Sequence, residues 1–212
     1  MFDFSFIDLD DTLFKTYLFK EDIYNCFARC GVSREDYKKT YSQAVFGPVV
    51  GYFDYTFKKH ADILRDLGYQ IPDSTIVELN KLLEKNYNFE DAENFLIEIK
   101  KISRQMILLT AGEQKLQEKK IAGSGLAKYF DGIEIIEGGK SQKIFELADS
   151  ASKILFVNDN MQENIQTKKD LPDIILVGTK HKVRWTEDNY EASNLPYFDT
   201  LSEVKDYVAR FI

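Results

Sequence analysis

Five short, almost wholly apolar runs, separated by longer stretches, constrain the fold of this chain most. The runs cover residues 4–7, 106–109, 133–136, 154–157 and 174–177. Apolar runs of this length indicate strands that are buried on both faces. Each gap from 106 onward can hold a helix, the last gap only a short one. The alternation predicts an α/β fold with a parallel sheet that helices cover on both sides through right-handed crossovers.

The long stretch between the first and second runs has a helical pattern. Apolar residues recur there at steps of three and four, and no convincing strand interrupts them. These positions are Ile23, Phe27, Ile63, Leu64, Leu67, Ile76, Leu79 and Leu82. An amphipathic segment, 90–102, then leads back to the second run. We therefore expect a core domain of residues 1–16 and 90–212, with an inserted α-helical domain at 17–89.

Composition narrows the range of partners. The chain has 212 residues and a formal net charge of −7, with a pI of about 5.0. An acidic protein of this kind is not expected to bind a nucleic-acid polymer, although a local positive pocket could bind a small anion. The amino terminus does not resemble a signal peptide, and no apolar run is long enough to span a membrane. We expect a cytoplasmic protein without a membrane partner, and Cys26 and Cys30 as reduced thiols.

Polar residues that follow the apolar runs are the first candidates for a site, because ligands bind at the carboxyl ends of parallel strands. Asp8 and Asp10 follow the first run in the sequence Asp8-Leu9-Asp10-Asp11-Thr12. Two carboxylates this close repel each other unless a cation or a shared proton compensates. Taken alone, the segment could equally be an acidic turn or a helix cap.

The later strand ends supply groups that suit a phosphate and a metal. Thr110 and Ala111 follow the second run, and a hydroxyl with backbone amides there can hold a phosphoryl oxygen. Lys140 stands at the start of the helix after the third run and could neutralise phosphate charge. Asp159 and Glu163 follow the fourth run, and oxygen ligands in this number suit Mg²⁺.

Taken in this order, the four segments resemble the four motifs of the haloacid dehalogenase (HAD) superfamily. The resemblance covers nearly the whole chain and includes Asp-x-Asp-x-Thr at 8–12 and the stretch Ser-Gly-Leu-Ala-Lys-Tyr-Phe-Asp at 124–131. It implies a Rossmann-like core, with the insertion at 17–89 as a helical cap of the kind found between motifs one and two.

The resemblance also implies a role for each matching residue. Asp8 would be the nucleophile that becomes phosphorylated, and Asp10 the acid and base that protonates the leaving alcohol and then activates water. Thr110, Ala111 and Lys140 would bind the transferring phosphoryl group. Mg²⁺ would be held by Asp8, by the backbone carbonyl of Asp10 and by Asp159.

The chain departs from the family pattern at two motifs. Asn158 stands where Gly usually precedes the fourth motif's Asp, and the second acid of that motif is Glu163, which we therefore expect to act at one remove from the metal. The third motif lacks the common Lys-Pro pair. We favour Lys140 over Lys143 because Lys140 lies at the start of the helix.

These residues predict a Mg²⁺-dependent phosphatase that hydrolyses a small phosphorylated metabolite through a phospho-aspartate. Asp10 argues against a dehalogenase, because a leaving halide needs no proton. Two alternatives stay open: a phosphomutase of the same superfamily, and a catalytically silent binding module.

The substrate class also stays open between a sugar phosphate and a nucleoside monophosphate. The inserted segment is rich in aromatic residues that could stack on a base but more simply form its own core. They include Tyr24, Phe46, Tyr52, Phe53, Tyr55 and Phe57. His60 and His181 fall in no motif and receive no role, and Trp185 is expected to pack at the surface. The sequence does not indicate an oligomeric state.

Overall fold

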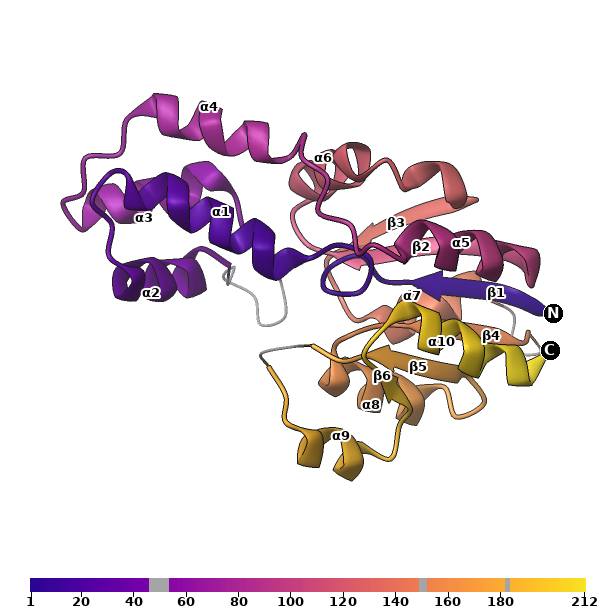
Figure 1. The fold of residues 1–212 in the computed structure, drawn as a ribbon. Coiled ribbons are helices and arrows are strands. Elements are labelled where there is room, and N and C mark those ends of the chain that lie inside the picture. The colour runs from indigo at the N-terminus through magenta and orange to yellow at the C-terminus, as the bar shows by residue number, and fades with distance from the viewer. Residues whose placement is uncertain (46–53, 149–151, 182–183) are drawn as a thin grey trace.

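A computed structural model describes residues 1–45, 54–148, 152–181 and 184–212. Phe46, Tyr52 and Phe53 of the expected aromatic set lie outside these residues. In the described chain a six-stranded parallel sheet has the strand order β3-β2-β1-β4-β5-β6 (Figure 1). Its strands are β1 (Phe2–Ile7), β2 (Ser103–Ala111), β3 (Gly132–Ile136), β4 (Ile154–Val157), β5 (Ile175–Thr179) and β6 (Tyr197–Phe198).

The α/β fold class predicted from the apolar runs is confirmed, and each run lies in or at the start of a strand. Side chains from the two faces of the sheet enter different cores, as the period of two in a strand requires. Leu108 and Val157 belong to the larger core, whereas Leu109 and Phe156 belong to the smaller one. Both faces are therefore apolar, which explains why the runs lack an alternating pattern.

The helices that follow β1 and those that alternate with later strands occupy different places. The first group consists of α1 (Thr16–Ala28), α2 (Arg34–Val45), α3 (Phe57–Asp66) and α4 (Asp73–Leu82). The others are α5 (Ala92–Lys101), α6 (Gln114–Ser124), α7 (Lys140–Leu147), α8 (Met161–Asp170), α9 (Glu187–Ser193) and α10 (Leu201–Val208), with 3₁₀ turns at Ala127–Tyr129 and Ala209–Phe211.

Helices α1 to α4 pack on one another beyond the carboxyl ends of the strands, on the left of Figure 1. The helical insertion is thus observed between β1 and β2, while its boundaries as a separate domain, 17–89, stay a prediction. His60 lies at its centre, fully buried among aromatic rings and hydrogen-bonded to Thr40 (2.9 Å) and Tyr55 (3.1 Å). Burial lowers the pKa of His60 to about 4, so this histidine is a neutral packing residue.

The structure also bears on the two cysteines, on membrane-spanning helices and on the last strand. Cys26 is buried, Cys30 is half-buried, and both are free thiols. None of the helices in the described residues combines the length and the apolar composition that crossing a membrane requires. The edge strand β6 was not expected, because two residues are too short to form a recognisable run.

A close backbone contact joins the end of α4 to α6. A Cβ atom added to Gly123 in α6 would lie 1.8 Å from the carbonyl oxygen of Leu83, which follows α4. Since the clashing atom belongs to the backbone, no side-chain rotation can relieve it. The inserted helices therefore contact α6 through a backbone approach that only glycine at position 123 permits.

We expect Gly123→Ala to lower the free energy of unfolding by about 1–3 kcal/mol through overpacking, although alanine is the better helix former. Urea denaturation followed by circular dichroism measures this change. Gly138→Ala is the control, because its added Cβ would have no atom within 4 Å. Equal stabilities of the two variants would contradict a close contact between Gly123 and the Leu83 carbonyl oxygen.

Candidate active site

A cavity of about 500 Å³ lies at the carboxyl ends of the strands, beneath the inserted helices. This volume is within the range of small-molecule sites. The cavity brings together the residues that the sequence singled out from four separate segments. Its lining includes Asp8, Asp10, Thr110, Ala111, Lys140, Asp159 and Glu163.

Asp8 is the buried carboxylate at the end of β1. Its Oδ1 accepts a hydrogen bond from Nζ of Lys140 at 2.7 Å, and Thr12 donates to Oδ2 at 3.4 Å. Burial raises the pKa of Asp8 and outweighs the attraction of Lys140, with Asp10 and Glu163 adding repulsion, so that the pKa is about 6. Asp8 is therefore an ionised acceptor at neutral pH whose charge is only partly compensated.

Lys140 connects three segments at the first residue of α7. Besides Asp8, its Nζ contacts Oδ1 of Asn158 and Oε2 of Glu163, both at 3.1 Å. Burial alone would lower the pKa of Lys140, but Asp8 and Glu163 hold it above its usual value. Lys143 instead pairs with glutamates outside the cavity. Of the two lysines, the structure thus places Lys140 at Asp8.

Thr110 ends the buried part of β2 with its hydroxyl unsatisfied. The side chain is 1% exposed, and among the described residues Oγ1 has no hydrogen-bond partner. A buried hydroxyl without a partner carries a desolvation cost that a ligand can remove. Because Thr110 and Ala111 line the cavity, a ligand there can supply the missing acceptor.

Asp159 follows β4 and is a second buried carboxylate, which the charge of Lys140 attracts without a direct contact. It is 7% exposed, and the structure gives it no hydrogen bond or ion pair with the described residues. Burial raises the pKa of Asp159 well above its usual value, and repulsion from Asp8 and Asp11 adds to this effect. The neighbouring Asn158 donates to Oε2 of Glu163 at 2.9 Å, which holds Glu163 beside Lys140.

Comparison with solved structures identifies the fold. The L-2-haloacid dehalogenase of Xanthobacter autotrophicus with chloropropionic acid covalently bound is 16% identical, with a TM-score of 0.66 over 99% of each chain. A structure from Bacillus subtilis described as the HAD-hydrolase YfnB bound to magnesium is 15% identical, with a TM-score of 0.65 over 97% of this chain and 98% of that one.

A third similar structure has a different named activity. It is described as a beta-phosphoglucomutase from Thermotoga maritima and is 12% identical, with a TM-score of 0.70 over 99% of this chain and 100% of that one. The chain has the haloacid dehalogenase fold. No family model matches the sequence, and no curated protein matches it. At these identities the likeness establishes the haloacid dehalogenase fold and no particular reaction.

Lys120 and Gln117 complete the surroundings of Asp10, and the sequence analysis missed both. Nε2 of Gln117 donates to Asp10 at 2.9 Å, and Lys120 and Thr16 contact its other oxygen. Burial would raise the pKa of Asp10, but Lys120, Thr16 and Gln117 outweigh it and lower the pKa to about 2. Spacing of three on α6 puts Gln117 and Lys120 on one face, but nothing in the sequence marks that face as the one toward Asp10.

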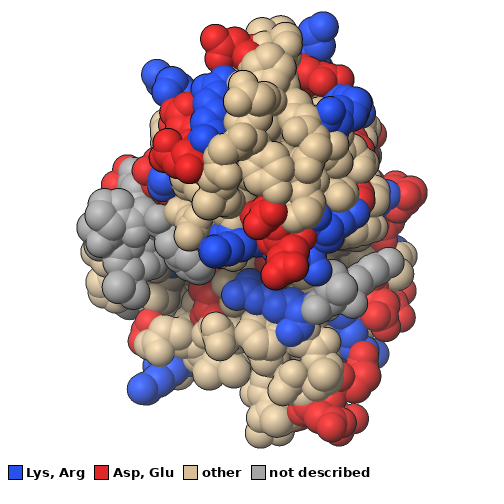
Figure 2. Space-filling view, turned by 90° about the vertical axis from the view of Figure 1, so that its left-hand side faces the viewer, with Lys and Arg blue, Asp and Glu red and all other residues tan. Residues whose placement is uncertain are grey.

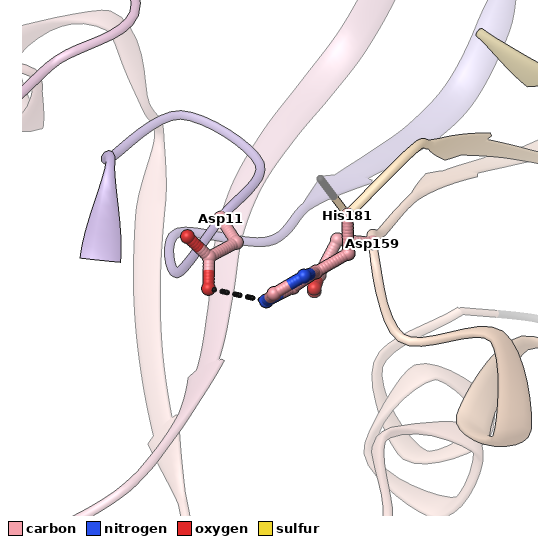
Figure 3. A group of neighbouring side chains, drawn as sticks. All are labelled: Asp11, Asp159 and His181. Atoms are coloured by element: carbon pink, nitrogen blue, oxygen red, sulfur yellow. Dashed lines mark ion pairs between the residues drawn. The ribbon is translucent and has the colours of Figure 1, made fainter. Parts of the chain in front are cut away.

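Asp11 and His181 were also missed, and they extend the acidic site (Figure 3). Nε2 of His181 lies 3.0 Å from Oδ2 of Asp11, and one ligand atom from each of Asp11, Asp159 and His181 lies within 4.8 Å of the others. Asp11 has φ of 55°, a left-handed conformation uncommon outside glycine. His181 follows β5, so the strand-end rule that found the other sites would have found it as well.

We expect Asp159→Asn to raise the free energy of unfolding in metal-free buffer by about 1–3 kcal/mol at pH 7 to 8, because it removes a buried charge that has no direct ion pair. The folded-state pKa of Asp159 is raised, so the folded protein binds the proton more tightly than the unfolded chain does. The wild type should lose stability relative to the variant as the pH rises from about 4 through that pKa.

Urea denaturation of both proteins between pH 4 and pH 8, with chelator present, measures the difference. Asp131→Asn is the control. Lys100 and the backbone N–H of Met106 lower the pKa of Asp131, so this substitution should lower the free energy of unfolding at neutral pH. A wild type that is more stable than Asp159→Asn at every pH would contradict the assignment of a buried charge without a direct ion pair.

Proposed function

We propose that this protein is a Mg²⁺-dependent phosphatase that hydrolyses a small phosphorylated metabolite through a phospho-aspartate on Asp8. The observation that carries the proposal is one buried arrangement at the strand ends. A carboxylate nucleophile, Asp8, lies beside a buried cation, Lys140, while an unsatisfied hydroxyl, Thr110, faces the same cavity. Phosphoryl transfer needs in-line positioning and neutralisation of spread negative charge, and Lys140 and the Thr110 hydroxyl are suited to the second requirement.

The residues present fit a magnesium ion. Asp8 and Asp159 are buried carboxylates whose pKa values are raised mainly by burial, and oxygen donors are the ligands that Mg²⁺ takes. We propose that these two side chains and the backbone carbonyl of Asp10 hold the ion, with Glu163 acting through Lys140 and Asn158. When bound, Mg²⁺ would neutralise charge on the phosphoryl group.

The chain's own groups then divide the reaction into two halves. Asp8 attacks phosphorus, and Lys140 and Thr110 bind the phosphoryl oxygens while the bond to the leaving alcohol breaks. Asp10 protonates the leaving oxygen and later takes a proton from the water that hydrolyses the phospho-aspartate. The contact with Lys120 favours ionised Asp10, which suits the water step.

The same residues bear on three alternatives: a dehalogenase, a phosphomutase and a silent binding module. A leaving halide needs no proton, so a dehalogenase would have no use for Asp10 and its three hydrogen-bonding partners. A phosphomutase would use the same groups, but it would return an isomerised sugar phosphate and little free phosphate. A silent binding module would bind a phosphate ester without turnover.

We expect Mg²⁺-dependent release of phosphate from an aryl phosphate and from some members of a panel of phosphorylated metabolites, abolished by excess chelator. Asp8→Asn should reduce kcat by about a thousandfold or more, because no other group can form the phospho-enzyme. Asp3→Asn is the matched control at the other end of β1, where Asp3 pairs with Arg104. Phosphate release by Asp8→Asn at the wild-type rate would eliminate the mechanism.

Thr110→Val should lower kcat by about a hundredfold, the usual effect of losing one preorganised donor to a developing charge. The control is Thr167→Val in α8. Thr167 is equally buried, its hydroxyl also has no partner among the described residues, and it lies outside the cavity. Similar activities of the two variants would mean that the Thr110 hydroxyl does not bind the phosphoryl group.

A further inference from the structure

Five basic side chains line the cavity, and three of them already have anionic partners. Lys140 pairs with Asp8, Lys120 pairs with Asp10, and His181 lies against Asp11. These cations serve the reacting end of the cavity. The remaining two are Lys20 and Arg184.

Lys20 and Arg184 face the cavity without a carboxylate partner in the described chain. Nζ of Lys20 lies over the ring of Tyr41, 5.3 Å from its centroid, and the guanidinium of Arg184 lies 5.1 Å from the ring of Trp185. Neither contact neutralises a charge. A cation on a cavity wall that lacks a protein anion is available to an anionic ligand.

The two cations belong to different walls. Lys20 lies on α1, among the inserted helices, and Arg184 lies in the connection between β5 and α9. Figure 2 views the molecule from the left-hand side of Figure 1 and shows Lys and Arg side chains across its middle, with Asp and Glu side chains among them. A ligand that reaches both cations therefore bridges the two walls.

The aromatic rings of the cavity are largely occupied by the protein itself. One face of Tyr41 carries the Lys20 ammonium group, and its ring packs on Tyr55 with centroids 4.9 Å apart. The hydroxyl of Tyr55 is hydrogen-bonded to His60 at 3.1 Å. These contacts leave less room for stacking on a nucleobase than the number of aromatic residues suggests, and they favour a compact charged group.

We infer that the substrate carries a second anionic group, a carboxylate or a second phosphate, which binds between Lys20 and Arg184. The inference rests on the proposed phosphatase activity and names its substrate class. The ester phosphate binds at Asp8, Lys140 and Thr110, and the second anion binds at Lys20 and Arg184 on the wall of the same cavity. Phosphorylated hydroxy acids and sugar bisphosphates have this form, whereas nucleoside monophosphates do not.

The test compares esters that differ only in the second anion. Phenyl phosphate is paired with 4-carboxyphenyl phosphate, glycerol 3-phosphate with 3-phosphoglycerate, and glucose 1-phosphate with glucose 1,6-bisphosphate, using the full-length protein and Mg²⁺. We expect at least one anionic member to have a kcat/KM about tenfold or more above its partner, mainly through KM, the usual effect of a charge-assisted contact. The pair that shows the preference distinguishes carboxylate from phosphate.

Lys20→Met and Arg184→Met should each reduce that preference by about tenfold while leaving kcat/KM unchanged for the esters that lack a second anion. Lys143→Met is the control, because Lys143 lies outside the cavity and pairs with Glu134 and Glu146. Equal kcat/KM values within every pair would overturn the inference. The inference would also be overturned if the two variants changed kcat/KM equally for esters with and without a second anion.

Binding to Asp8→Asn separates this inference from the proposed function. Calorimetric titration of that protein with each pair reports recognition without turnover, and we expect the anionic member to bind about tenfold more tightly. If the wild type releases no phosphate but the binding preference is present, the phosphatase proposal fails and the anion site stands. If phosphate is released but neither binding nor kcat/KM discriminates, the anion site fails alone.

Discussion

The buried ion pair between Lys140 and Asp8 is the interaction on which the rest of the site depends. It joins the start of α7 to the end of β1, and through Asn158 and Glu163 it also fixes the loop after β4. Removal of one partner from a buried pair leaves an uncompensated charge, which is far more costly than loss of a surface pair. Three segments that lie far apart in the sequence, from Asp8 to Glu163, are thus held together by one ammonium group.

The balance of charge around this pair is incomplete. Lys140 pairs with Asp8 and Glu163, and Lys120 pairs with Asp10, but Asp159 has no direct ion pair in the described chain. A protein selected for stability alone would not bury such a carboxylate. Asp159 is buried there because the carboxyl ends of the parallel strands, and the acids that follow them, lie at the same edge of the sheet.

The sequence predicted the strands and the groups at their ends because both depend on local pattern. Apolar runs define β1 to β5, and the order of Asp8, Thr110, Lys140 and Asp159 along the chain was enough to place them at one edge. The two-residue strand β6 leaves no pattern to recognise. Lys120 contacts Asp10 only when α6 packs next to β3 and its side chain reaches the loop after β1, a tertiary relation that helical spacing cannot reveal.

Helix α1 joins the proposed anion site to the surroundings of Asp10. Thr16 and Lys20 are four residues apart, so they lie on one face of the helix, where Thr16 contacts Asp10 and Lys20 lines the cavity. A second anion bound by Lys20, as proposed, would therefore contact the same helix whose Thr16 holds Asp10.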